Sequence, residues 1–181
     1  MALTSSNVRV AVTGKVSVGP TATAAPTSSV SVLAVGFVDL GYVGPDGVVE
    51  KRERSTSDLK AWQNNDVLRT VVTDGKISFT FTLLETSKAA LEVFYGATTA
   101  GPTATDGRLD VIPTATGGRK SFVIDVVDGT ETKRIYLASG EVTEVGDVVH
   151  VGTEAIGYEI TVTGYPSGGS SAQIWITALH S

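Results

Sequence analysis

Few residues of this chain have the type and spacing that metal binding or thiol chemistry requires. The two histidines, His150 and His180, are far apart, and neither has a second ligand at the spacing of a metal site. We expect His150 to be an ordinary residue of a strand over Val148–Val151, and His180 to lie in a frayed terminus. The 181 residues contain no cysteine, which excludes disulfides, thiolate metal sites and a cysteine nucleophile.

Motifs for other common catalytic sites are also missing. There is no Gly-x-Ser-x-Gly elbow, and the Gly-Gly-Ser-Ser string at 168–171 is typical of a solvated loop. No Gly-Lys-Ser/Thr follows a glycine-rich loop, so a phosphate cradle is not predicted. Glu141, Glu144 and Asp147 lack the alternating spacing of a calcium loop and indicate a solvated hairpin rim. We therefore predict that the chain is not an enzyme and that it binds no cofactor.

Composition favours a folded chain, which we expect to form a single domain over residues 1–181. Hydrophobic residues make up 41% and charged residues 18%, which suits a packed core. No apolar run approaches the roughly 20 residues that a membrane helix needs. The formal net charge of −5 offers no global attraction to nucleic acid.

Alternating apolar residues predict a mainly β fold, most clearly between Leu68 and Leu83. Asp74-Gly75 has the signature of a two-residue type I′ hairpin turn. That turn would pair Val72 with Ile77 and Leu68 with Phe81, placing both pairs on one apolar face. The strand residues predicted for the core are Leu68, Val72, Ile77, Phe79 and Phe81. The reverse face is mostly polar and is expected to meet water; its residues include Arg69, Lys76, Ser78, Thr80 and Thr82.

A second hairpin is predicted over Ser121–Leu137, with a four-residue loop at Asp128–Glu131. This loop pairs Ile124 with Ile135 and Asp125 with Arg134. Alternation and β-propensity predict further strands. They are Val8–Val18, Val30–Val43, Val142–Val145, Val148–Val151, Tyr158–Thr163 and Gln173–Leu179.

One helix is predicted, from Ser87 to Tyr95. Ser87 or the preceding threonine can cap its first turn, and Gly96 can end it. Leu91 and Phe94 fall on one side, so we expect the helix to pack on a sheet through these two side chains. They complete the predicted core.

The stretch Gly41–Asp66 is predicted to be a long, charged loop between strands. Seven of the eleven residues from Glu50 to Lys60 are charged, and their signs alternate. Mixed signs suit repeated contacts between copies better than binding of one charged ligand. An isolated tryptophan in such a segment usually anchors a contact. The candidate interface residues are Glu50, Lys51, Arg52, Glu53, Arg54, Asp58, Lys60 and Trp62. Other loops are expected near 19–29, 97–106 and 166–172.

Residues 35–96 resemble the major tail proteins of siphophages, whose tails are long and non-contractile, notably those of actinobacterial hosts. The similarity rests on the segment 41–63 with its charged run and the string Lys-Ala-Trp-Gln at 60–63, on the continuation 64–76, and on Phe-Thr-Leu-Leu-Glu-Thr at 81–86, in that order. It extends to Tyr95-Gly96. After Ala97 no distinctive motif is shared.

The resemblance implies a β-sandwich or barrel with one packed helix, assembled as stacked hexameric rings. Sheets of six subunits would join into a barrel around a lumen that holds the tape measure protein and then conducts DNA. The dense mixed charge of residues 41–66 predicts that this segment bridges neighbouring rings. The lumen-facing candidates would be Arg69, Lys76, Ser78, Thr80 and Thr82.

The same resemblance implies a virion location after assembly in the host cytoplasm. The partners would be other copies of the chain, the tape measure protein, transiting DNA without sequence-specific contacts, and tail terminator and distal tail proteins, with no membrane.

Three other readings remain open from the residues alone. A virion decoration or adhesion β-domain shares this composition and would stay a soluble monomer or trimer. A carbohydrate-binding β-sandwich would need clustered exposed aromatic residues, and only 7% of residues are aromatic. A hydrolase would need a convergent carboxylate or histidine site.

Overall fold

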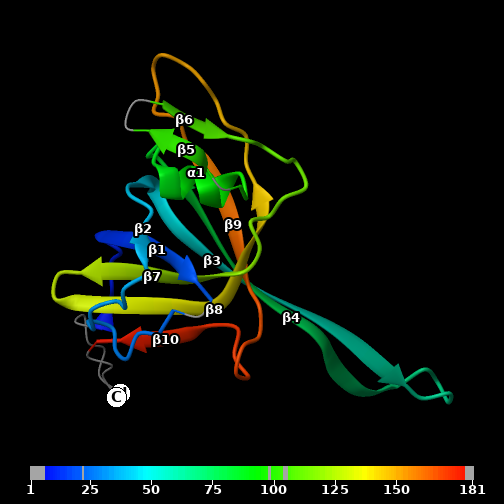
Figure 1. The fold of residues 1–181 in the computed structure, drawn as a ribbon. Helices are drawn as coiled ribbons and strands as arrows, with labels where there is room; N and C mark the ends of the chain where they lie inside the picture. The colour runs from blue at the N-terminus through cyan, green and yellow to red at the C-terminus, as the bar shows by residue number, and fades with distance from the viewer. Residues whose placement is uncertain (1–6, 22, 98, 104–105, 178–181) are drawn as a thin grey trace.

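The structure of the protein is a computed structural model, which describes residues 7–21, 23–97, 99–103 and 106–177. Within these ranges the chain forms one eight-stranded antiparallel sheet, a separate two-stranded hairpin and one short α-helix (Figure 1). The mainly β fold predicted from the sequence is confirmed.

The strands of the main sheet follow the order β2-β1-β7-β8-β9-β4-β3, and β10 also pairs with β8. Their bounds are β1 Thr13–Pro20, β2 Val38–Asp39, β3 Val43–Lys60, β4 Val67–Leu83, β7 Lys120–Asp128, β8 Glu131–Val145, β9 Tyr158–Gly164 and β10 Gln173–Ile176. The first half of β8 pairs with β10 and its second half pairs with β9. The partner of β8 changes near Gly140. A Cβ at this position would lie 2.7 Å from the Phe122 ring, which is too close, so a glycine suits the site.

One core fills the space between the sheet and helix α1 (Lys88–Phe94). The Ser87 side chain caps the helix by accepting the Ala90 N–H at 3.3 Å, as predicted. The Phe94 ring lies 5.3 Å from that of Tyr158 on β9. Strand residues buried in this core include Val16, Phe79, Phe81, Leu83, Phe122, Ile124, Leu137, Ile160 and Val162.

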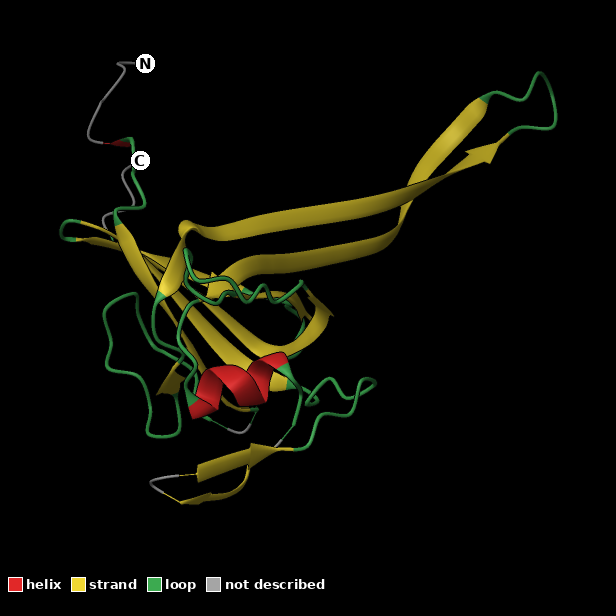
Figure 2. Ribbon diagram, turned by 90° about the horizontal axis from the view of Figure 1, so that it is seen from above, coloured by secondary structure: helices red, strands yellow, loops and turns green. Residues whose placement is uncertain are grey.

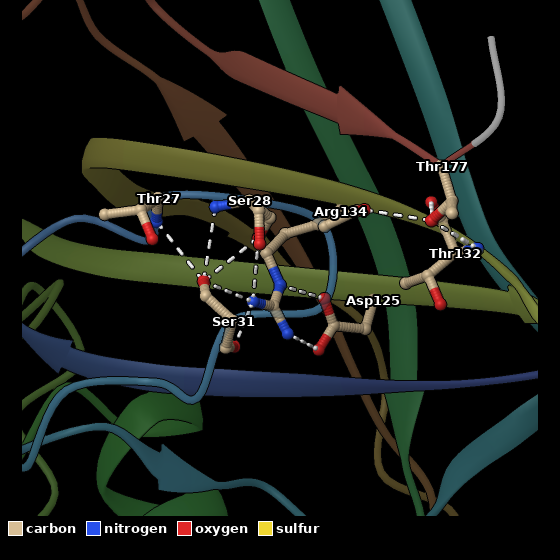
Figure 3. Close-up of polar contacts among 8 residues, drawn as sticks. Thr27, Ser28, Ser31, Asp125, Thr132, Arg134 and Thr177 are labelled. Carbon is tan, nitrogen blue, oxygen red and sulfur yellow. Dashed lines mark hydrogen bonds and ion pairs between the residues drawn. The ribbon is translucent and has the colours of Figure 1, made fainter.

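The predicted hairpin over Ser121–Leu137 is confirmed, with Ile124 opposite Ile135 and Asp125 opposite Arg134. Its turn is shorter than the predicted four-residue loop, because Asp128 pairs with Glu131 and only residues 129–130 lie between the strands. Asp125 and Arg134 form a buried, bidentate ion pair with N···O distances of 2.6 and 3.0 Å (Figure 3). Arg134 Nη1 also donates to the carbonyl oxygens of Ser28 and Ser31, at 3.1 and 2.6 Å. It thereby holds the loop after β1 against the sheet.

This clamp explains why the predicted strand Val30–Val43 is wrong. The carbonyls of residues 28 and 31 bind a guanidinium group, and Gly36 has φ +119°. Only β2 and the first residue of β3 belong to strands in that range. Two other strand boundaries differ from the prediction. Strand β1 begins at Thr13 instead of Val8, and β10 ends at Ile176, whereas the predicted strand continues to Leu179, outside the described residues.

The predicted turn at Asp74-Gly75 is also wrong. Strand β4 runs straight through it, with Gly75 opposite Arg54 on β3. The reversal occurs at 61–66, where Asn64 and Asn65 have φ of 57° and 56° and the Ala61 N–H donates to the Asp66 carbonyl at 2.7 Å. The turn signature at Asp74-Gly75 is local, and the pairing of β3 with β4 along most of their length outweighs it. The predicted charged loop is therefore strand β3.

Two smaller predictions change as well. Residues 148–151 are a largely exposed loop that pairs with no strand in the described structure, so His150 is not a strand residue. The predicted loop at 97–106 contains β5 (Thr99–Thr103) and the start of β6 (Asp106–Leu109), which pair with each other. The loop at 166–172 agrees with prediction and is closed by a Ser167–Ser170 bridge. His180 lies outside the described residues.

Candidate assembly interface: the β3–β4 ribbon

Strands β3 and β4 leave the body of the molecule together as a long two-stranded ribbon (Figures 1 and 2). The pairing of β4 with β9 ends at Ile77, so earlier residues of β4 pair with β3 alone. We call residues 50–76 the ribbon. Two β-bulges interrupt its pairing, one near Ser55 and one near Leu59.

The ribbon is exposed over most of its length, and this corrects two predicted core residues. Leu68 and Val72 are 66% and 59% exposed, because within the described chain no second layer covers this part of β4. On the same strand, Phe79 and Phe81 are buried and Ile77 is half-buried against the core. A two-stranded hairpin with so little burial is marginally stable on its own in water.

The tip of the ribbon carries exposed apolar side chains, the largest of which is Trp62. Trp62 is 96% exposed and sits in the 61–66 turn. Leu59 and Val67, on the two strands next to that turn, are exposed as well. Exposed aromatic and aliphatic residues gathered at one end of a projection are typical of an interaction site.

The charged residues of the ribbon have different environments. Glu50 anchors its base through Lys133 on β8, with an N···O distance of 3.1 Å. Lys51 and Glu53 form an exposed pair at 2.6 Å, whose hydrogen bond lowers the pKa of Glu53 and raises the pKa of Lys51. Asp58 accepts a hydrogen bond from Thr70 across the ribbon at 2.7 Å.

Several cations of the ribbon have no ion-pair partner among the described residues. They are Arg52, Arg54, Lys60, Arg69 and Lys76. The ribbon holds six basic and five acidic residues, a formal charge of +1, whereas the rest of the chain amounts to −6. This difference in sign favours contact between the ribbon of one copy and the body of another.

The face of the sheet opposite the core carries a group of hydroxyl side chains. Thr80 contacts Thr161 on β9 with an oxygen–oxygen distance of 2.8 Å, and Thr143 on β8 contacts Thr163 at the same distance. Ser78 lies opposite Thr163 in the register, and both are buried, at 5% and 4% exposure. The prediction that Ser78 meets water is therefore wrong, whereas Thr80 and Thr82 are half-buried. Three of the five predicted lumen residues, Ser78, Thr80 and Thr82, therefore belong to the body. Lys76 stands at the base of the ribbon, and Arg69 lies near its tip.

Within the described residues, no group of three or more His, Asp or Glu side chains could hold a metal ion. No helix in that part of the chain is both long and apolar enough to span a membrane.

Comparisons with known proteins place this fold. A family model described as phage tail tube protein matches residues 1–179. A chain of the extended sheath–tube complex of an extracellular contractile injection system, PVC, is 10% identical with a TM-score of 0.52, covering 98% of this chain and 100% of that one. A chain from the virion of a native gene transfer agent particle is 9% identical with a TM-score of 0.42, covering 78% and 89%. No curated protein matches significantly in sequence. The match over almost the whole length shows that this chain belongs to the phage tail tube protein family.

Proposed function

We propose that copies of this chain polymerise as stacked hexameric rings into the tube of a phage tail, and that the tube conducts phage DNA. The family match supports a structural virion role, and the match over residues 1–179 fits one tail-tube domain. The observation that carries the assembly proposal is the exposed ribbon. Its residues bridge neighbouring rings.

A neighbouring copy supplies what the isolated ribbon lacks. The outer edge of β3 pairs with no strand in the described structure, and open strand edges are usually paired or protected. Burial of Trp62 and Leu68 against another copy would remove exposed apolar surface from water. Ring and stack contacts therefore stabilise both the ribbon and the tube.

The half-buried hydroxyl side chains of Thr80 and Thr161 line the bore in this proposal. A surface past which DNA slides should hold few fixed cations, because each phosphate contact releases counterions and strengthens binding. Neutral hydroxyl groups meet that requirement. Arg69, out on the ribbon, takes part in ring contacts instead.

The tube would enclose the tape measure protein before DNA transit and end on terminator and distal tail proteins. Assembly in the host cytoplasm, a long non-contractile tail and an actinobacterial host remain predictions from the sequence resemblance.

Electron microscopy of the purified full-length chain tests polymerisation. We expect rings or tubes at high concentration. A matched variant replaces residues 54–75 with Asn-Gly, which joins Glu53 to Lys76 through a two-residue hairpin turn. Because the core residues are kept, its near-ultraviolet circular dichroism should show a folded body, but it should form no tubes. Normal tubes from this variant, or a wild type that stays a monomer or trimer, would contradict the proposal.

A cysteine at Thr80 tests the bore, since the chain has no other thiol. In tubes, Thr80→Cys should react with a small maleimide but not with one carried on a particle wider than the bore. The comparison variant is Val35→Cys, at a fully exposed loop position. Equal labelling of assembled Thr80→Cys by both reagents would place that face outside.

A further inference from the structure

A groove runs between the starts of β1 and β3, next to two open strand edges. Its walls are residues 11–15, 41–45, 47 and 48, with Asp39, Glu85 and residues 125–126 of β7. Strand β2 pairs with only Ser17 and Val18 of β1, which leaves the β1 edge beside the groove without a strand neighbour in the described chain. The ring of Tyr42 is largely exposed at this groove.

The groove and the ribbon tip lie at opposite ends of the same strand. Strand β3 begins with Val43, which lines the groove, and ends beside the tip at Lys60, 17 residues later. Its partner β4 covers the same distance in 16 steps, from Leu83 to Val67, which corresponds to roughly 50 Å of extended chain. If identically oriented copies are stacked along this direction, the tip of one copy approaches the groove of the next, a head-to-tail contact that repeats.

The acidic side chains of the groove are held in place before any partner arrives. Glu85 accepts the Tyr42 N–H at 3.0 Å, and its carboxylate lies against Gly41, where a Cβ would collide with it. Asp39 accepts the Gly41 N–H at 3.0 Å. Gly41 has φ +84°, a conformation that favours glycine, and its lack of a side chain leaves room for the Glu85 carboxylate.

The charges of the two surfaces are complementary. Apart from Asp125, which is paired with Arg134, the charged residues of the groove are two acids and one base: Asp39, Glu85 and Lys15. The charged residues of the tip, from 60 to 69, are two bases and one acid: Lys60, Arg69 and Asp66. Each surface also offers one exposed aromatic side chain, Trp62 at the tip and Tyr42 at the groove.

We propose that the ribbon tip of one copy seats in the β1–β3 groove of the next copy along the stack, with Trp62 beside Tyr42. This inference rests on the proposed function, because it names the receptor for the ribbon. Lys60 and Arg69 then face Asp39 and Glu85, and these charges fix the orientation of the tip more than they add affinity.

Cross-linking of paired cysteine variants tests whether the ribbon tip binds in the groove, and it leaves Trp62 and Tyr42 unchanged. The chain has no cysteine, so every thiol is an introduced one. The test variant carries Gln63→Cys at the tip and Thr13→Cys in the groove, both at exposed positions. The matched control carries Gln63→Cys with Val35→Cys, on an exposed loop outside the groove. Assembled tubes are treated with a short bismaleimide and run on a denaturing gel.

We expect the test variant to give a ladder of dimers, trimers and longer chains, because each copy is joined to one above and one below. One thiol per copy can join at most two copies, so Gln63→Cys alone should give no ladder, and the control pair should give none either. If tubes of the test variant give no ladder, or if the control pair gives one instead, the tip does not bind in the groove. The proposal that the chain forms tubes would still stand. A wild-type chain that forms no tubes would overturn the proposed function itself.

Discussion

The two halves of the β3–β4 pair have the same secondary structure but opposite environments. Near the body, Phe79 and Phe81 are buried under the helix and the curled sheet. Further out on the same strand, Leu68 and Val72 are exposed, although they continue the apolar character of the sequence. One continuous hairpin therefore serves as core at its base and as free surface at its end.

This difference separates two kinds of stabilisation. Apolar side chains at the base contribute to folding of the single copy, because folding removes them from water. Those of the ribbon gain burial only if another molecule covers them. Substitutions at the base should therefore change the free energy of unfolding, and substitutions in the ribbon should change assembly.

The largest effect on unfolding is expected from Phe79→Ala at the base. Loss of a buried aromatic side chain and the resulting cavity should cost about 3–5 kcal/mol. The matched variant is Leu68→Ala in the ribbon, which should change the monomer by less than about 0.5 kcal/mol. Urea unfolding of the monomeric protein measures both. Similar losses for the two variants would erase the distinction between base and ribbon.

Two ion pairs sharpen the same comparison. Asp125→Ala leaves the buried Arg134 guanidinium without its carboxylate and should cost about 3–5 kcal/mol. In contrast, Glu53→Ala removes a solvent-exposed pair with Lys51 and should leave monomer stability nearly unchanged. Thermal and urea unfolding at neutral pH test this pair of variants. A strong loss from Glu53→Ala would mean that the ribbon stabilises the single copy.

Trp62→Ala should act on assembly instead of folding. A truncated aromatic anchor costs about 2 kcal/mol per contact, so the concentration at which tubes form should rise roughly 30-fold. Light scattering and electron microscopy across a concentration series measure it, and the unfolding curve of the monomer should stay unchanged. Gln63→Ala, at the next residue of the turn, is the matched control. Equal effects of the two variants would remove Trp62 as the anchor.

Leu91 on helix α1 lies between the two extremes, half-buried against the core. Leu91→Ala should therefore cost about 1–2 kcal/mol, less than Phe79→Ala, because part of this side chain already meets water. Urea unfolding provides the value, with Lys88→Ala on the exposed side of the helix as reference. No change from Leu91→Ala would show that the helix packs through its buried residues Ala90, Val93 and Phe94 alone.

Local patterns in the sequence determined several elements correctly. The helix and its Ser87 cap, the second hairpin with Asp125 opposite Arg134, and the burial of Phe79 and Phe81 follow from spacing within short segments. Such features depend on neighbouring residues, which the sequence displays directly. The density of charge between Glu50 and Lys60, with Trp62 close behind it, likewise marks this segment as unusual from residue types alone.

Only the tertiary structure decided where the first hairpin turns and which of its apolar residues are buried. The Asp74-Gly75 signature is local, whereas the pairing of β3 with β4 extends over most of both strands and outweighs it. Exposure of Leu68 and Val72 depends on how far the body reaches along the strand, which no alternation of residue types records. The groove between β1 and β3 likewise exists only because a curled sheet brings its two ends together.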